Sequence, residues 1–393
     1  MNQVDDRPDL LKLMREDSSL APDIYHTTNY WSFYEQMFIP ELIEHGLTDF
    51  RRRYPSILNS FGATDLTPPW IIDVRQWLIF GNRIAHKIPF MNELLMLLNR
   101  ILNKLLHLMP YYLNYVKSTS VRSSGSEAEK VGAKSVFEFE ASLNGNPQDV
   151  INVGNKSYTT SMLIYYLRYV YCSGFLDFGN LNTLVELGSG SGKQIEVIRK
   201  LHPDICFFVF EIPPQLYVCE QYLSSVFPES VVSYKQTRES SFTPKIEKGK
   251  IYIIGNWRFP IVENLSIDLF WNSASFQEME PNVVSHYLHF VNEKAKNCYL
   301  FEKMDGKELA SDLEGGGVLE QSTIQDYYAG LSNMKLIDLS RAKYPKNSLL
   351  HIPLSRKVRE KVIDKSKLSL EAPLLLQNIS TAKGYRNSFW QRK

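Results

Sequence analysis

The chain has 393 residues, of which 44% are apolar and 22% charged, and its formal net charge is +1. These values are typical of a soluble globular protein and give no electrostatic reason to expect nucleic acid or an anionic membrane as the main partner. No uncharged apolar stretch is long enough for a membrane span, and the N-terminal residues lack the apolar core of a secretory signal. Four scattered cysteines form no CxxC pair, so we expect reduced, buried thiols and a cytoplasmic location.

Residues 1–135 are expected to form a helical N-terminal region that covers the substrate side or mediates oligomerisation. "WSFYEQMFIPELIEHGL" (31–47) keeps apolar residues three and four apart, and Gly46 stands where the helix would end. Residues 94–109 carry an apolar stripe that suits a packed core helix, a membrane surface or a homo-oligomer contact. The core helix is the favoured interpretation. Residues 118–135 lose apolar side chains and gain Ser, Gly and charges, which predicts a loop or linker.

From about residue 151, short apolar strands alternate with helical segments. Near-continuous apolar runs are typical of parallel strands that are covered on both faces. Five such runs occur, at residues 183–188, 206–212, 250–257, 267–273 and 298–303. Helix-period stretches at 193–201 and 215–227 follow the first two runs. The alternation predicts an α/β fold with a doubly wound, Rossmann-like sheet.

We expect this domain to span residues 136–355 and to be followed by a C-terminal tail, residues 356–393. The beginning of the tail, residues 356–373, is charged in the manner of a surface helix. Its last ten residues, "GYRNSFWQRK", contain enough aromatic side chains to dock on the rest of the protein.

Three glycines mark the turn between the first strand and its helix. Gly188, Gly190 and Gly192 permit positive φ and close approach of a ligand, and the following helix offers free N–H groups. Lys193 stands where a dinucleotide fingerprint needs its third glycine, and the spacing of a P-loop also fails. The loop therefore predicts a ligand other than a dinucleotide or a P-loop nucleotide. Lys193 itself is expected to be a solvated residue of the first helical turn.

Two acidic residues indicate which ligand fits. Glu186 precedes the first glycine by two positions, where it would repel a phosphate but attract an ammonium group. Glu211 ends the second strand, 23 residues after Gly188, where a carboxylate can accept the two hydroxyls of a ribose. The amino-acid end of S-adenosyl-L-methionine is an example of a ligand whose ammonium group suits Glu186.

The glycine loop followed by Glu211 resembles the class I S-adenosylmethionine-dependent methyltransferases. "IIGNW" resembles the element after the third strand of that family, which implies that Asn256 contacts the adenine amino group and that Trp257 or Ile254 covers the ring. "IDLFWNSASFQEM" resembles the fourth strand and the substrate-facing loop. The cofactor-binding residues that the resemblance implies are Glu186, Gly188, Ser189, Gly190, Gly192, Glu211, Ile212, Asn256, Trp257 and Asn272.

A closer resemblance is to the bacterial sugar O-methyltransferases associated with surface polysaccharides. It rests on the motifs "YWSFYEQ", "GLTDFRRR", "NGNP", "YYLRY", "EIPPQL" and "SFQEM" and covers the chain from about Trp31 to about Leu339. Glu211 stands where the commoner pattern of this family has Asp. The resemblance implies methyl transfer to a hydroxyl of a sugar or a polysaccharide precursor, so a small-molecule or glycan acceptor is the expected partner.

A sugar hydroxyl is a poor nucleophile while protonated, so a general base would help the transfer. Glu278, in the loop after the fourth strand, is the favoured catalytic residue, and His286 and His289 are further candidates. His286 and His289 have a spacing that a metal ion can use, but a packed helix is the favoured interpretation and no metal is expected. Glu302 fits either a helper of the base or a plain charge at the end of a strand.

Further alternatives concern the N-terminal region and the protein as a whole. Two interpretations are open for the aromatic residues Tyr30, Trp31 and Tyr34: they stack on the face of a sugar, or they pack in the core of the helical region. Two are also open for "FRRR" (50–53): a contact with a phosphate group, or solvated surface charge. Three other functions are open. The first is a cofactor-binding or assembly protein without catalysis, the second a methyltransferase for a non-sugar small molecule, and the third an NAD-type oxidoreductase, which Lys193 disfavours.

Overall fold

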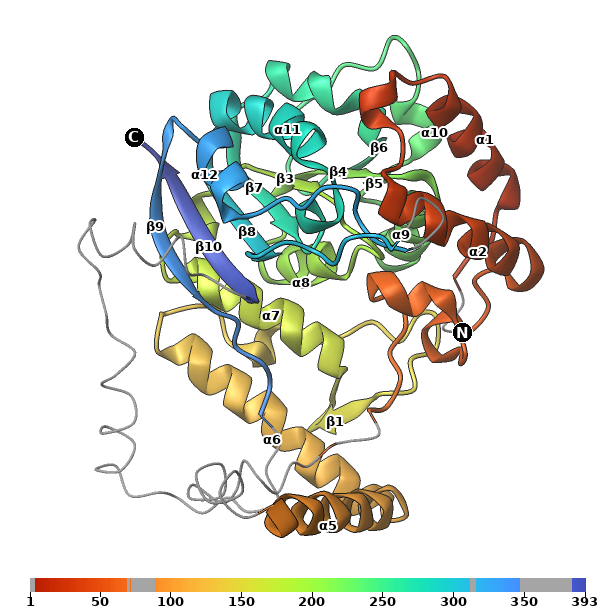
Figure 1. The fold of residues 1–393 in the computed structure, drawn as a ribbon, viewed down its shortest axis with the longest axis vertical. Helices are drawn as coiled ribbons and strands as arrows, with labels where there is room; N and C mark the ends of the chain where they lie inside the picture. The colour runs from red at the N-terminus through yellow and green to blue at the C-terminus, as the bar shows by residue number, and fades with distance from the viewer. Residues whose placement is uncertain (1–3, 69–70, 72–88, 312–315, 347–383) are drawn as a thin grey trace.

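The computed structural model describes residues 4–68, 71, 89–311, 316–346 and 384–393 (Figure 1). Within these ranges the centre of the molecule is an eight-stranded sheet. Its strands are β3 (Thr183–Leu187), β4 (Cys206–Glu211), β5 (Val231–Val232), β6 (Ile251–Gly255), β7 (Ile267–Ser273), β8 (Ala295–Lys303), β9 (Met334–Arg341) and β10 (Tyr385–Arg392). A separate small hairpin pairs β1 (Ile151–Val153) with β2 (Lys156–Tyr158).

The strand order in the sheet is β5-β6-β4-β3-β7-β8-β10-β9. All neighbours from β5 to β8 pair in parallel, and β10 runs antiparallel between β8 and β9. The chain winds outward in one direction from β3 to β4 and β6, and then in the other direction from β7 to β8. In an open α/β sheet, ligands bind beyond the carboxyl ends of the strands at such a reversal, so the β3/β7 junction is where a site is expected.

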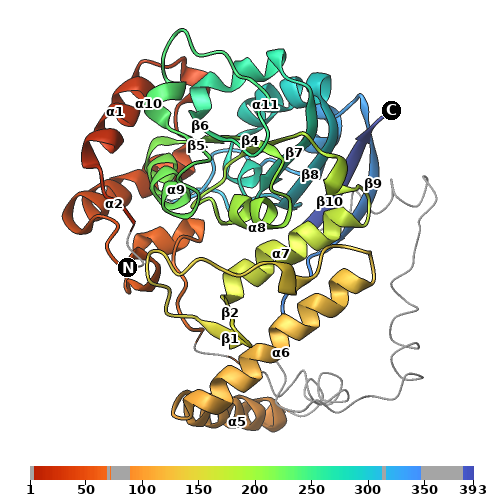
Figure 2. The same ribbon diagram turned by 180° about the vertical axis from the view of Figure 1, so that it is seen from behind.

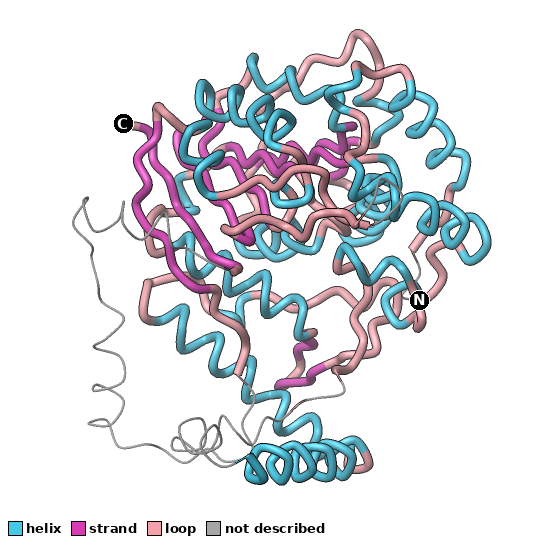
Figure 3. Tube along the Cα trace, viewed as in Figure 1, coloured by secondary structure: helices cyan, strands magenta, loops and turns pink. Residues whose placement is uncertain are grey.

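Helices cover both faces of the sheet (Figure 3). On one face, Leu184 and Phe207 belong to the core that also includes side chains of α7, α8 and α9. On the other face, Val185 and Phe208 pack with side chains of α11 and α12. The bounds of these helices are α7 (Thr160–Ser173), α8 (Lys193–Leu201), α9 (Pro213–Val226), α11 (Pro281–Lys294) and α12 (Ile324–Gly330); a short α10 (Tyr234–Thr237) precedes β6. The predicted doubly wound α/β fold is confirmed.

Among the described residues of the N-terminal region, the α-helices are α1 (Pro8–Ser19), α2 (Asn29–His45), α5 (Pro89–His107) and α6 (Pro110–Glu129). Helix α2 confirms the helix predicted for 31–47 and ends at Gly46, which has a φ of 53°. Helix α1 packs on α9, whereas α5 lies at the far end of the molecule and contacts α6 (Figure 2). Interpreting α5 as a core helix was wrong for its main apolar stripe, which is exposed.

The prediction of a loop at 118–135 was also wrong, because α6 continues to Glu129. Its hydroxyl side chains bond to carbonyls of the preceding turn, for example Thr119 Oγ1 to Val116 O at 2.7 Å, so they do not compete for helix N–H groups. Val116, Val121 and Ala128 are buried. Packing of this face against the rest of the protein therefore outweighs the low intrinsic helix propensity of the Ser-rich segment.

The expected docking of the last ten residues is confirmed. They form strand β10, in which Phe389 and Trp390 are fully buried. The sequence analysis had placed these residues in a tail separate from the domain, but β10 lies inside the sheet and completes it. The proposed boundary at residue 355 and the surface helix expected for 356–373 lie outside the described residues. All four cysteines are buried and free, as expected.

Candidate active site

A cavity of about 260 Å³ opens at the carboxyl ends of β3, β4 and β7, where the strand order reverses. It contains the first two loop glycines, three carboxylates and two cations, and Trp31 and Phe61 of the N-terminal region line it from the other side. The polar residues of the lining are Ser60, Tyr165, Arg168, Glu186, Ser189, Gln194, Glu211, Gln215, Ser273, Ser275, Gln277, Glu278, Lys307 and Tyr385. Five of the ten cofactor residues proposed from the sequence thus line one cavity: Glu186, Gly188, Ser189, Gly190 and Glu211.

The three loop glycines have φ values of +80°, +57° and +79°, which side chains rarely tolerate. A Cβ on Gly188 would lie 2.3 Å from Ser275 Oγ, and one on Gly190 would lie 3.0 Å from Phe61 O. The loop is therefore enclosed by the β7 loop and by the N-terminal region. Gly192 does not line the cavity; a Cβ there would meet Leu223 on α9 at 2.8 Å, so this glycine allows α8 to pack on α9.

Glu211 bridges the end of β4 and the glycine loop. Its Oε2 accepts a hydrogen bond from Gly190 N at 2.7 Å and its Oε1 accepts one from Ile212 N at 2.9 Å. Burial raises the pKa of Glu211 to about 7, although these two bonds favour the charged form. Each carboxylate oxygen can accept more than one hydrogen bond, so Glu211 keeps acceptor capacity toward the cavity that it lines.

Glu186 is a buried carboxyl in the lining of the cavity. Its side chain belongs to a residue that is only 2% exposed, and its Oε2 has no hydrogen-bond partner in the part of the chain that the structure describes. Burial and the neighbouring Glu211 raise the pKa of Glu186 well above its ordinary value. Arg168 opposes this shift, but its guanidinium lies over the ring of Phe301 at 4.3 Å. A buried carboxylate without a bonded partner is costly, so this position suits a cationic ligand.

Glu278 and Lys307 form an ion pair in the lining of the cavity, with Nζ 2.8 Å from Oε1. Burial raises the pKa of Glu278 to about 7, and Lys307 limits that rise. Lys307 also lies 4.8 Å from the ring centroid of Tyr30. The loop that carries Glu278 is fixed from both sides, since Thr28 Oγ1 donates to Glu278 O and Glu302 accepts a bond from Gln277 N.

The structure does not bring every proposed residue to the cavity. Asn256 is buried and its Nδ2 donates to Tyr25 O at 2.8 Å and to Tyr287 Oη at 3.1 Å. Trp257 also lies outside the cavity lining and packs over Gly255, where a Cβ would meet its indole ring at 2.4 Å. The Nδ2 group of Asn256 is thus engaged by Tyr25 and Tyr287, whereas its Oδ1 has no hydrogen-bond partner among the described residues.

Asn272, Ile212 and His286 also lie outside the lining. Asn272 connects β7 to the glycine loop, because its Nδ2 donates to Leu187 O and its Oδ1 accepts from Phe276 N. Ile212 contributes its backbone N–H to Glu211. His286 is on α11, with its Nε2 2.8 Å from Tyr25 Oη.

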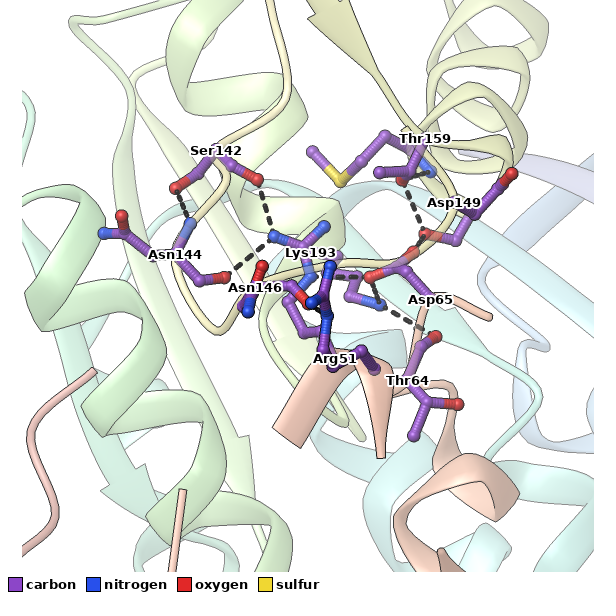
Figure 4. A network of polar contacts seen from close by, with 12 residues as sticks. Arg51, Thr64, Asp65, Ser142, Asn144, Asn146, Asp149, Thr159 and Lys193 are labelled. Carbon is purple, nitrogen blue, oxygen red and sulfur yellow. Dashed lines mark hydrogen bonds and ion pairs between the residues drawn. The ribbon is translucent and has the colours of Figure 1, made fainter. Parts of the chain in front are cut away.

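Lys193 is not solvated, contrary to the sequence-based expectation. It is 1% exposed, and its Nζ lies 2.7 Å from Asp65 Oδ2 (Figure 4). The same carboxylate oxygen accepts from Arg51 Nε at 2.6 Å, so Arg51 of "FRRR" is buried in an ion pair and is not a solvated surface residue. Burial lowers the pKa of Lys193 to about 8 against the attraction of Asp65. This network joins the N-terminal region to the first turn of α8, directly after the glycine loop.

Sequence reasoning missed several residues of the cavity. Arg168 and Tyr165 come from α7, and Lys307 and Tyr385 come from segments after β8. Arg168 and Tyr165 stand in the "YYLRY" motif, but nothing in its spacing distinguishes them from core positions. Trp31 had been weighed as a stacking residue, and the structure places it in the lining, whereas Tyr30 is buried and packs with Trp31 and Tyr34.

Other kinds of site receive no support within the described ranges. There is no group of three or more His, Cys, Asp or Glu side chains arranged to hold a metal ion there. None of the helices built from those residues combines the length and apolar character needed to cross a bilayer.

Comparison with known proteins gives matches to solved structures only; no family model and no curated protein sequence matches the chain. Mitomycin 7-O-methyltransferase MmcR matches with 12% identity over 57% of this chain and 57% of its own, at a TM-score of 0.32. The O-methyltransferase of a trans-AT PKS multienzyme of Brevibacillus brevis, in complex with S-adenosyl-L-homocysteine, matches with 12% identity over 58% and 71%, at 0.34. The pyocyanin biosynthetic protein PhzM matches with 10% identity over 58% and 54%, at 0.32. These matches cover only part of each protein. The assignment of the fold given above was made from the strand order of this chain alone.

Proposed function

We propose that this chain is an S-adenosylmethionine-dependent O-methyltransferase. The observation that carries the proposal is the pair of carboxylates Glu186 and Glu211, which end adjacent parallel strands and face one cavity at the switch point of the sheet. Glu186 is buried without a bonded partner, as a site for an ammonium group would be. Glu211 is fixed by two backbone N–H groups and retains acceptor capacity for ribose hydroxyls.

The chain would hold the cofactor through these groups and through the bare backbone of the glycine loop. Glu186 would accept the ammonium group, Glu211 the ribose hydroxyls, and Gly188 and Gly190 would let the ligand lie against the main chain. When bound, the cofactor supplies an activated methyl group on a sulfonium. The protein then has to place the acceptor oxygen in line with that methyl group and to remove its proton.

Glu278 is positioned to remove the proton. A pKa of about 7 matches a general base that works near neutral pH, because the group is then both ionised and a reasonable acceptor. Lys307 stabilises the ionised form from one side, and Thr28 and Glu302 hold the loop in place. Carboxylate and acceptor hydroxyl would need to approach to about 2.6–3.2 Å.

For the acceptor we propose the hydroxyl of a sugar or another small molecule. The sugar assignment is supported by the motifs that resemble bacterial sugar O-methyltransferases and by Trp31, an aromatic side chain in the cavity lining that could stack on a sugar face. Natural-product hydroxyls are the alternative, since the names of several matched structures refer to such compounds. Four buried free thiols support a reducing compartment, and we propose the cytoplasm.

The proposal is tested by measuring S-adenosylhomocysteine release from S-adenosylmethionine with a panel of nucleotide sugars, glycans and phenolic acceptors. Glu278→Gln should lower turnover about 10²–10⁴-fold on any acceptor found, while leaving cofactor affinity within twofold. The matched control is Glu280→Gln, two residues further along and outside the cavity lining, which should keep turnover. Near-normal turnover of Glu278→Gln would refute the role of the base, and cofactor binding without transfer to any acceptor would favour a non-catalytic protein.

A further inference from the structure

Helix α5 presents an apolar surface to solvent on the side that faces away from the protein. At 100° per residue the side chains of this surface fall within an arc of roughly 120°. They are Phe90, Leu94, Leu97, Leu98, Ile101, Leu105, Leu108 and Met109, all of them exposed. We call this set the α5 face. Figures 1 and 2 show α5 at one end of the molecule, beside α6 and far from the sheet.

The opposite side of α5 packs against the protein and buries polar groups. Leu95 and Leu106 form a small cluster with Val116 of α6 and with Ile71. Asn103 is buried among them, where its Oδ1 accepts a hydrogen bond from Ile71 N at 2.6 Å and its Nδ2 donates to Asn99 O at 2.9 Å. The helix is thus fixed in an orientation that places asparagines inside and most of its leucines outside. Exposing these apolar side chains to water is unfavourable for an isolated monomer. A partner that covers them would remove this cost.

The size of the α5 face is that of a specific interface. With about 200 Å² for a fully exposed large apolar side chain, its eight members expose roughly 800 Å². The largest apolar patch of a typical monomer is about 300–600 Å². A standard protein–protein interface buries about 800 Å² on each partner.

We propose that the α5 face binds the α5 face of a second copy of this chain, with the two helices antiparallel. A two-fold contact requires a self-complementary surface. Five of the eight members of the α5 face, Leu94, Leu97, Ile101, Leu105 and Leu108, are placed symmetrically about Ile101. In this pairing Leu94 faces Leu108 of the other copy and Leu97 faces Leu105. Ile101 lies on the axis and meets its own counterpart. The proposal concerns a surface remote from the cavity and does not depend on what the cavity binds.

The observations favour a second copy over a lipid bilayer as the occupant. A helix that lies in a membrane interface keeps a strongly charged face in water. The side of α5 opposite the apolar face is packed on α6 instead, and the helix carries only two basic residues, Arg100 and Lys104, against Glu93. Apart from His107, little positive charge is therefore available for anionic lipids.

Light scattering after size exclusion, across a dilution series of the full-length protein, measures the proposed association. The wild type should have twice the mass of the chain, and Ile101→Glu should weaken dimerisation by about 10³-fold, because each dimer carries the substitution twice at its centre. Ile246→Glu is the matched control: Ile246 is 46% exposed and Ile101 is 48% exposed, but Ile246 lies outside the α5 face. It should remain dimeric.

A cross-link tests the register independently of whether Ile101→Glu folds normally. In the antiparallel pairing, Ile101→Cys places two thiols on the symmetry axis, so mild oxidation should give a disulfide-linked dimer; Ile246→Cys should stay monomeric on non-reducing gels. A wild type that is monomeric at all concentrations would overturn the proposal. The proposal would also be overturned if the monomer floated with anionic phosphatidylserine vesicles and Ile101→Glu abolished this flotation. That result would assign the α5 face to a membrane surface.

Discussion

Replacing Glu186 by Gln is expected to stabilise the ligand-free protein and to weaken its affinity for S-adenosylhomocysteine. The substitution keeps the shape of the side chain and removes the charge of a carboxylate that is enclosed at the end of β3. Glu186 Oε2 has no hydrogen-bond partner among the described residues, so the carboxamide gives up no bond at that atom. Opposite effects on stability and on affinity are the signature of a group kept for binding rather than for folding.

The magnitude follows from the proton linkage of this carboxyl. Burial and Glu211 hold the pKa of Glu186 in the folded protein well above its ordinary value, so the folded state binds the proton more tightly than the unfolded state. The contribution of Glu186 to stability therefore falls as pH rises above the ordinary pKa of a glutamate. The gain from Gln should be near zero at pH 4 and about 2 kcal/mol at pH 8, the penalty of a buried unpaired polar group. Loss of the ammonium–carboxylate contact should weaken binding about 30-fold.

Urea unfolding at the two pH values and calorimetric titration at pH 8 measure these effects. Glu220→Gln is the control for affinity, since Glu220 is also a buried carboxyl whose pKa burial raises to about 7, but it lies outside the cavity lining. It should leave the affinity unchanged. The reasoning is refuted if Glu186→Gln binds S-adenosylhomocysteine as tightly as the wild type, or if it destabilises the protein at pH 8.

Two more predictions concern the acceptor side and the network behind the loop. Glu278 must be ionised to accept a proton, and burial raises its pKa to about 7. Turnover should therefore rise about tenfold per pH unit below pH 7 and level off above it. A pH–rate profile that is flat from pH 5 to 9 would exclude this base. Lys193→Met should lower the free energy of unfolding in urea by about 3–5 kcal/mol, since Asp65 loses one of its two buried cationic partners. The control is Lys200→Met, at a partly exposed ion pair on the same helix. It should change the free energy of unfolding by less than about 1 kcal/mol. Equal losses of stability in the two variants would show that the buried ion pair of Lys193 stabilises the protein no more than the partly exposed one.

Much of the fold could be predicted because its signals are local. The near-continuous apolar runs that became β3, β4 and β7 are buried on both faces, and the glycine loop lies where a strand turns into a helix. Where local and tertiary preferences disagree, the sequence misleads. The Ser-rich part of α6 has the composition of a loop, yet it is helical because one face is buried.

The candidate site was predictable to the same extent. Glu186 and Glu211 belong to a motif with fixed spacing, and Glu278 follows its strand closely, so the sequence alone brings them to one edge of the sheet. Lys193 and Asn256 have partners far away in the chain. Asp65 lies 128 positions before Lys193, and Tyr25 lies 231 positions before Asn256. No spacing in the sequence indicates such contacts, which arise only when the N-terminal region packs over the glycine loop.

The measurement that tests the account most directly is calorimetric titration of the wild type and of Glu211→Ala with S-adenosylhomocysteine, with Asn256→Ala as control. The account predicts one-to-one binding by the wild type. Glu211→Ala removes the acceptor for both ribose hydroxyls and should bind about 30-fold more weakly. Asn256→Ala should bind with little change, because Asn256 lies outside the cavity lining and donates to Tyr25 and Tyr287. Absence of binding by the wild type, or equal affinity of Glu211→Ala, would contradict the assignment of this cavity to the cofactor.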